Sequence, residues 1–153
     1  MTAAATVFAA TFAALYAAHS VGDHWIQTHH QACGKGAPGR AGQIACAKHV
    51  LTLTTTKAAA LAAMQIVTGL HLPLTAVYVA LAVDAISHYW ADRRTTLAAL
   101  ADRVGKGDFY RMGAPRPGHD DAPHLGTGAY ALDQSWHIAW LFISALIVAW
   151  GAS

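Results

Sequence analysis

The sequence contains no glutamate and no asparagine, so all eight of its acidic residues are aspartates. Charged residues make up only 12% of its 153 positions, where a soluble domain usually has about 25%. Hydrophobic residues make up 55%, and the mean hydropathy is +0.33. This composition excludes an ordinary soluble domain. It predicts a membrane protein in which apolar helices alternate with polar loops.

The sequence also has few cysteines and a small net charge. The two cysteines, Cys33 and Cys46, are too few for a disulfide framework, so we expect free, reduced thiols. A net charge of +2, without a basic stripe interleaved with aromatic residues, does not indicate nucleic-acid binding. The first ten residues carry no Lys or Arg, and a secretory signal peptide normally has a basic start. We therefore expect the first apolar segment to be retained as a transmembrane helix.

Four apolar segments reach, or nearly reach, the roughly 20 residues that a helix needs to cross a bilayer. They cover about residues 3–26, 42–70, 72–91 and 130–150. The third begins next to Pro73, which is tolerated in the first turn of a helix. The sequence thus predicts an all-α fold, with one integral membrane domain over residues 1–153 built as a four-transmembrane-helix bundle.

Two longer connections, residues 27–41 and 92–129, join these segments. The second opens with RTTLAALADRV, whose apolar residues recur at helical spacing and predict a short amphipathic helix on the membrane surface. Residues 105–128 are rich in Gly and Pro and show neither a helical nor a strand period. Within them, HDDAPH at 119–124 fits either a solvated loop or a lid.

Basic residues indicate how the chain is oriented. Lys and Arg gather in the two longer connections, whereas the chain ends and the short connection near residues 69–73 have none. By the positive-inside rule, both termini face outward and both longer loops are cytoplasmic. Lys57 does not fit this pattern, because it lies about two turns inside the second segment.

Histidines and aspartates recur near the cytoplasmic end of every predicted span. Where two share a span they are four residues apart, which places them on one face of a helix. They are His19 and Asp23 in the first span, His49 in the second, His88 and Asp92 in the third, and Asp133 and His137 in the fourth. Ionisable groups in a bilayer are costly, so we expect them to face the bundle interior, paired or coordinated.

Imidazole and carboxylate without thiolate suit Zn²⁺, Mn²⁺, Fe or Ni²⁺. We therefore predict that these seven residues bind a divalent transition metal, with zinc the first choice. Seven candidate ligands exceed what one tetrahedral ion needs, so one ion with supporting carboxylates and two ions are both open. The competing interpretations are a purely structural polar network, a proton or ion pathway, and a haem site.

Further polar residues near the same depth suggest catalysis and substrate binding. Asp84 lies one turn deeper than His88 and is predicted to act as a general base or to orient that imidazole. Lys48, Arg93 and Arg94 are expected to bind a substrate phosphate, with topology and anionic-lipid contact as the alternative.

Gln27 and Gln134 are expected to support the ligands by hydrogen bonding. His24 is offset from the helix face of His19 and is left outside the predicted site. The role of Lys57 stays open between catalysis, charge compensation and snorkelling.

The order of these motifs resembles the domain-of-unknown-function 3307 family of small bacterial and phage integral membrane proteins. The resemblance covers nearly the whole chain and is carried by His19-Ser-Val-Gly-Asp23-His-Trp-Ile-Gln27-Thr28, His49, His88-x-x-x-Asp92-Arg93 and Asp133-Gln134-x-x-His137. It implies the same topology and site in the inner membrane of a bacterium, and it implies no particular reaction.

These features lead to a functional hypothesis. We predict a membrane-embedded metal-binding protein, with a metal-dependent hydrolase acting on a lipid-linked phosphoester near the cytoplasmic headgroups as the leading hypothesis. The alternatives are a divalent-metal carrier or metal-binding regulatory membrane protein, and a structural partner protein whose polar layer fixes helix register. Membrane lipid is the expected partner, nucleic acid is not, and a homo-oligomer is open.

Overall fold

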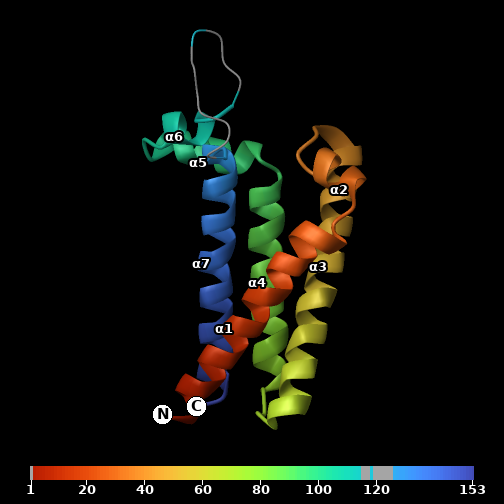
Figure 1. The fold of residues 1–153 in the computed structure, drawn as a ribbon, viewed down its shortest axis with the longest axis vertical. Coiled ribbons are helices and arrows are strands. Elements are labelled where there is room, and N and C mark those ends of the chain that lie inside the picture. The colour runs from red at the N-terminus through yellow and green to blue at the C-terminus, as the bar shows by residue number, and fades with distance from the viewer. Residues whose placement is uncertain (1, 115–117, 119–125) are drawn as a thin grey trace.

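Four long helices run along the molecule, and short helices gather at one of its ends (Figure 1). The computed structural model describes residues 2–114, 118 and 126–153. In chain order the elements are α1 (Ala3–Val21), the π-helix η1 (Gly22–Ile26), α2 (His29–Gly34), α3 (Gly39–Thr68), α4 (Leu74–Asp92), α5 (Thr95–Arg103), α6 (Gly107–Arg111) and α7 (Gly128–Gly151).

Four of these helical segments are long and apolar enough to cross a membrane. They are Ala3–Ile26, Gly39–Thr68, Leu74–Asp92 and Gly128–Gly151. No β-strand occurs in the part of the chain that the structure describes. The prediction of an all-helical protein with four membrane-length apolar helices is therefore confirmed.

Local sequence signals explain where α3 and α4 begin and end. Pro38 and Pro73 stand at the N-caps of α3 and α4, where a missing backbone N–H costs nothing. Gly69 ends α3 with a φ of 69°, a left-handed conformation that glycine adopts without strain. As a result, α3 starts and ends earlier than the segment 42–70 expected from hydropathy.

The four long helices form a closed bundle. α1 packs against α3 and α7, and α4 packs against the same two helices. The start of α1 and the end of α7 lie together at one end, called here the terminal end, whereas α2, α5 and α6 lie at the other, called the loop end (Figure 1). An apolar core fills the interior toward the terminal end and includes Val7, Leu15, Leu61, Leu72, Leu81, Leu141 and Val148.

Short helices occupy much of the two predicted loops. Residues 27–41 contain α2, which starts with a capping box between Thr28 and Gln31. The sequence THHQ has the spacing of this motif, which a search for apolar segments does not detect. α5 lies where a short amphipathic helix was predicted, and α6 forms in the Gly/Pro-rich segment that showed no period. The candidate lid at 119–124 falls outside the described residues.

A π-helix continues α1 and changes the direction of its side chains. η1 begins at Gly22, where a Cβ atom would lie 2.2 Å from Cδ1 of Leu53. Glycine therefore lets this segment approach α3 closely. Because a π-helix has a wider turn than an α-helix, residues after Gly22 point in other directions than a continuous α-helix would give them, although Nε2 of His19 and Oδ2 of Asp23 still lie 3.5 Å apart.

Candidate metal centre

The seven predicted ligands come together from all four long helices near the loop end. Five of them are almost completely buried, with exposed fractions of 0–2%: His19, His49, His88, Asp92 and His137. Asp23 keeps 6% of its side-chain surface exposed and Asp133 keeps 24%. The bundle thus encloses a cluster of imidazoles and carboxylates that opens to solvent mainly at Asp133.

Four of these residues form a tight inner group, called here the inner quartet. Nε2 of His49 and Nε2 of His88 lie 3.1 Å apart. Oδ1 of Asp23 lies 3.0 Å and 3.7 Å from these two nitrogens. Oδ2 of Asp92 lies 3.3 Å and 3.2 Å from the same pair. The quartet therefore consists of two triangles of ligand atoms that share the His49–His88 edge.

Within each triangle, the separations of 3.0–3.7 Å are close to those between neighbouring ligands of a coordination shell. A tetrahedral zinc site with metal–ligand distances of about 2.0–2.1 Å separates its ligand atoms by about 3.3 Å. Oδ1 of Asp23 and Oδ2 of Asp92 are buried, and among the described residues they face imidazole nitrogens at ion-pair distance without a well-aligned hydrogen bond. Buried carboxylates are costly unless a charged or hydrogen-bonding partner compensates them, so a cation among the quartet would stabilise both carboxylates.

The remaining predicted ligands flank the quartet. His137 stacks on His88, with ring centroids 3.8 Å apart and planes 16° apart, and its Nε2 lies 3.3 Å from Oδ1 of Asp133. Ligand atoms of His88, Asp92 and His137 also lie within 4.8 Å of one another, as do those of Asp23, His49 and His88. Both a single ion and two neighbouring ions are compatible with this arrangement.

His19 lies on the terminal side of the cluster. Its Nε2 is 3.5 Å from Oδ2 of Asp23, and its ring centroid is 5.1 Å from that of His137 and 5.5 Å from that of His88. Neither ring nitrogen has a hydrogen-bond partner among the described residues. His19 is thus positioned to orient Asp23 or to reach an ion by a small rotation of its side chain.

Asp84 lies apart from the inner quartet and forms a buried ion pair with Lys57. Its Oδ2 is 2.5 Å from Nζ of Lys57, and the two side chains are 3% and 0% exposed. The pair links α4 to α3 deeper in the bundle. Lys57, which did not fit the distribution of basic residues, is thus neutralised by Asp84. Neither residue lines the cavity described below.

Sequence reasoning did not assign Lys35 to the site. This residue caps α2, is 9% exposed, and places its Nζ 2.9 Å from Oδ1 of Asp92. Arg93 holds the loop that carries it, because its guanidinium donates to the carbonyls of Lys35 at 2.7 Å and Ala37 at 2.6 Å. Of the predicted phosphate-binding residues, Arg93 thus contacts backbone, and Lys48 is exposed on α3.

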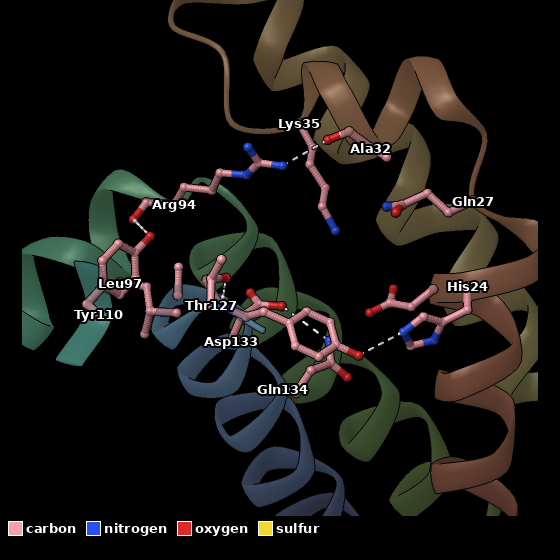
Figure 2. Close-up of a pocket in the computed structure, with 14 residues that line it drawn as sticks. His24, Gln27, Ala32, Lys35, Arg94, Leu97, Tyr110, Thr127, Asp133 and Gln134 are labelled. Atoms are coloured by element: carbon pink, nitrogen blue, oxygen red, sulfur yellow. Dashed lines mark hydrogen bonds between the residues drawn. The ribbon is translucent and has the colours of Figure 1, made fainter. Parts of the chain in front are cut away.

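A cavity of about 510 Å³ opens beside the cluster at the loop end. Lys35 and Arg94 approach it from one side and Asp133 and Gln134 from the other (Figure 2). Tyr110 also lines it, and burial, aided by the Asp133 carboxylate, raises the pKa of this phenol. The hydroxyl therefore stays protonated, and it donates to the carbonyl of Arg94 at 3.4 Å (Figure 2).

Residues of η1, of its C-cap and of α7 also line the cavity. His24, left outside the predicted site, lines it and contacts the hydroxyl of Tyr130 at 3.1 Å (Figure 2). The π-helix explains the difference, because its geometry turns His24 as well as Asp23 toward the cavity. Gln27 also lines the cavity, and Gln134 donates to Oδ2 of Asp133 at 3.3 Å.

Fold and site together define a class: an all-helical protein with four membrane-length helices and a buried histidine–aspartate cluster able to hold a metal ion. A family model described as "Protein of unknown function (DUF3307)" matches residues 11–153. The chain belongs to this family, and the resemblance seen in the sequence is confirmed. No curated protein and no solved structure matches the chain.

Proposed function

We propose that this protein is a membrane-embedded, metal-dependent hydrolase that acts on a lipid-linked phosphoester at the level of the headgroups. The inner quartet supports the metal part of the proposal, because Asp23 and Asp92 each place a buried carboxylate oxygen at ligand spacing from the His49 and His88 nitrogens. A divalent ion, with zinc the first choice, would supply the Lewis acid that hydrolysis needs.

The cavity supports the hydrolytic part. It joins the cluster to the outside of the bundle at Asp23 and Asp133, so a substrate has a route to the inner quartet. Lys35 and Arg94 offer positive charge to a phosphate in this space. Asp133 is the better placed general base, because it lines the cavity and is oriented by Gln134, whereas Asp84, expected from the sequence, is paired with Lys57 and does not line the cavity.

We expect the purified protein to carry close to one transition-metal ion per chain, or two, by elemental analysis. The metal-loaded protein in detergent should hydrolyse p-nitrophenyl phosphate or bis(p-nitrophenyl) phosphate, lose this activity with a chelator, and regain it when zinc or manganese is returned. A protein that binds no zinc, manganese, iron or nickel would contradict the site. A metal-loaded protein without turnover would contradict only the hydrolase.

A divalent-metal carrier is the main alternative, since it would also need ligands in the bundle. The described interior between the cluster and the terminal end disfavours a carrier, because it is mainly apolar and its buried polar side chains there are few, namely the Lys57–Asp84 pair, Thr11 and Ser144. Metal uptake by sealed vesicles containing the protein would favour the carrier, whereas metal retention without flux would favour the hydrolase.

For the orientation, we propose that the loop end faces the cytoplasm of a bacterium and that both chain termini face outward. The basic residues at the loop end support this orientation through the positive-inside rule. They include Lys35, Arg40, Arg93, Arg94, Arg103, Lys106 and Arg111. Membrane lipid is then the natural partner of this end, and its anionic headgroups would contact these residues.

The two native cysteines provide a topology test. Cys33 is exposed on α2 at the loop end, whereas Cys46 is fully buried. A membrane-impermeant maleimide should therefore leave intact cells unlabelled and should label Cys33 in inverted membrane vesicles. A Cys33→Ser variant serves as the control and should stay unlabelled in both. Labelling of Cys33 from outside intact cells would invert the proposed orientation.

A further inference from the structure

Two apolar grooves extend from the cavity along the outside of α7. The first, of about 240 Å³, lies between α5 and α7 and is lined by residues that include Leu97, Leu100, Leu132 and Trp136. Leu97 also lines the polar cavity beside the cluster. The polar cavity and this first groove therefore share a wall at α5.

A second groove continues in the same direction. It has a volume of about 490 Å³ and is lined by Val83, Ile86, Ser87, Trp90, Trp136 and Trp140. Trp136 lines both grooves, and its indole is fixed by stacking on Trp90 and by donating to Oγ of Ser87 at 3.0 Å. The two grooves thus follow one another on the α4–α7 face.

This path changes from polar to apolar as it leaves the cluster. Most residues lining the cavity are charged or polar, and the first groove still includes Lys106 and Ser135. Among the described residues, Ser87 is the one hydroxyl or charged side chain lining the second groove, beside three tryptophans. Ser87 and Trp136 directly precede His88 and His137 in the chain, so the grooves lie at the depth of the metal ligands. An occupant would need a polar head at the cavity and an apolar tail that runs along α7.

Charge favours an anionic head. A divalent ion in the inner quartet would offset the carboxylates of Asp23 and Asp92. Lys35 and Arg94 would then outweigh the carboxylate of Asp133, which also lines the cavity, and leave an excess of positive charge. A second copy of this chain could cover the apolar grooves, but it would not account for the charged cavity next to the first groove.

We propose that the two grooves bind the hydrocarbon chain of a membrane lipid whose phosphate head lies in the cavity against Lys35 and Arg94. This inference rests on the proposed function, and it assigns the grooves as the part of the protein that recognises the lipid substrate. Because lipid tails are as apolar as the groove, close packing rather than a hydrophobic driving force would hold the tail in it. It aligns the head with the inner quartet.

Native mass spectrometry of the metal-loaded full chain tests this site. The protein is released from micelles that contain equal amounts of dioleoyl phosphatidic acid and dioleoyl phosphatidylcholine. The wild-type protein should retain one phosphatidic acid in preference to phosphatidylcholine. Ala139, an exposed residue that lines the first groove, is replaced by tryptophan to fill it. Ala139→Trp should weaken retention by at least about five-fold, the low end of what overfilling a site costs.

Two further variants separate the head from the tail. Ala59→Trp places the same side chain on an exposed position of α3, which lines neither groove, and should leave retention unchanged. Arg94→Gln should reduce the preference for phosphatidic acid over phosphatidylcholine. Equal retention of both lipids by the wild-type protein, or full retention by Ala139→Trp, would overturn the proposal.

Oligomeric state and metal content are measured on the same samples. Dimers of the wild-type protein that Ala139→Trp dissociates would overturn the lipid site and show that the grooves are an interface between copies of the chain. Lost lipid selectivity with normal metal content would overturn this inference alone, whereas a wild-type protein without metal would overturn the proposed function.

Discussion

Asp92→Asn is expected to release the metal from the inner quartet. The substitution keeps the volume of the side chain but removes the charge of a carboxylate that lies 3.2–3.3 Å from two imidazole nitrogens. Losing a partner that only supports a ligand costs about 10- to 100-fold in metal affinity, so loss of a ligating charge should raise the metal dissociation constant by at least about 100-fold. Competition with a chelator of known affinity measures this change.

Asp102→Asn is the matched control for this variant. Asp102 is an exposed aspartate at the same end of the bundle, where it pairs with Arg111 at 2.8 Å. Its substitution should leave the metal dissociation constant unchanged. Far-UV circular dichroism of both variants checks that the helices remain. A folded Asp92→Asn protein with wild-type metal affinity would exclude Asp92 as a ligand.

Lys57→Met is expected to destabilise the bundle without emptying the metal site. It leaves the buried carboxylate of Asp84 without its partner at 2.5 Å, and breaking a buried ion pair in this way costs about 3–5 kcal/mol. The double variant Lys57→Met/Asp84→Leu should recover most of this free energy, because an apolar pair needs no charge compensation. Unfolding by dodecyl sulfate in mixed micelles measures the difference.

Lys48→Met controls for the loss of a lysine on the same helix. Lys48 is exposed, so its substitution should change the free energy of unfolding by no more than about 0.5 kcal/mol. A Lys57→Met protein as stable as wild type would show that the buried pair is not formed. The double variant also tests catalysis: a stable, metal-loaded protein without hydrolytic activity would identify Asp84 as the base, and an active one would favour Asp133.

Much of the fold could be predicted from the sequence because bilayer-length apolar segments have few alternatives. Each has to satisfy its own backbone hydrogen bonds, and a helix does so locally. The short helices α2 and α6 were harder to predict, since their signals are caps and packing rather than hydropathy. Gly128 illustrates the packing signal: a Cβ atom there would lie 1.5 Å from the carbonyl oxygen of Phe109, so α6 approaches α7 closely only because that residue is glycine.

The candidate site divides in the same way. The sequence by itself determined that histidines and aspartates recur at one depth in four helices, because the four-residue spacing and the bilayer fix a helix face and a level. Only the tertiary structure decided which of them touch. It placed Asp23 and Asp92 each within 3.0–3.7 Å of the His49 and His88 nitrogens, paired Asp84 with Lys57, and brought in Lys35 from the connection between the first two long helices. The physical reason is that helix periodicity is a local property, whereas these contacts depend on how the π-helix at Gly22 turns and on how the four helices rotate and pack against one another.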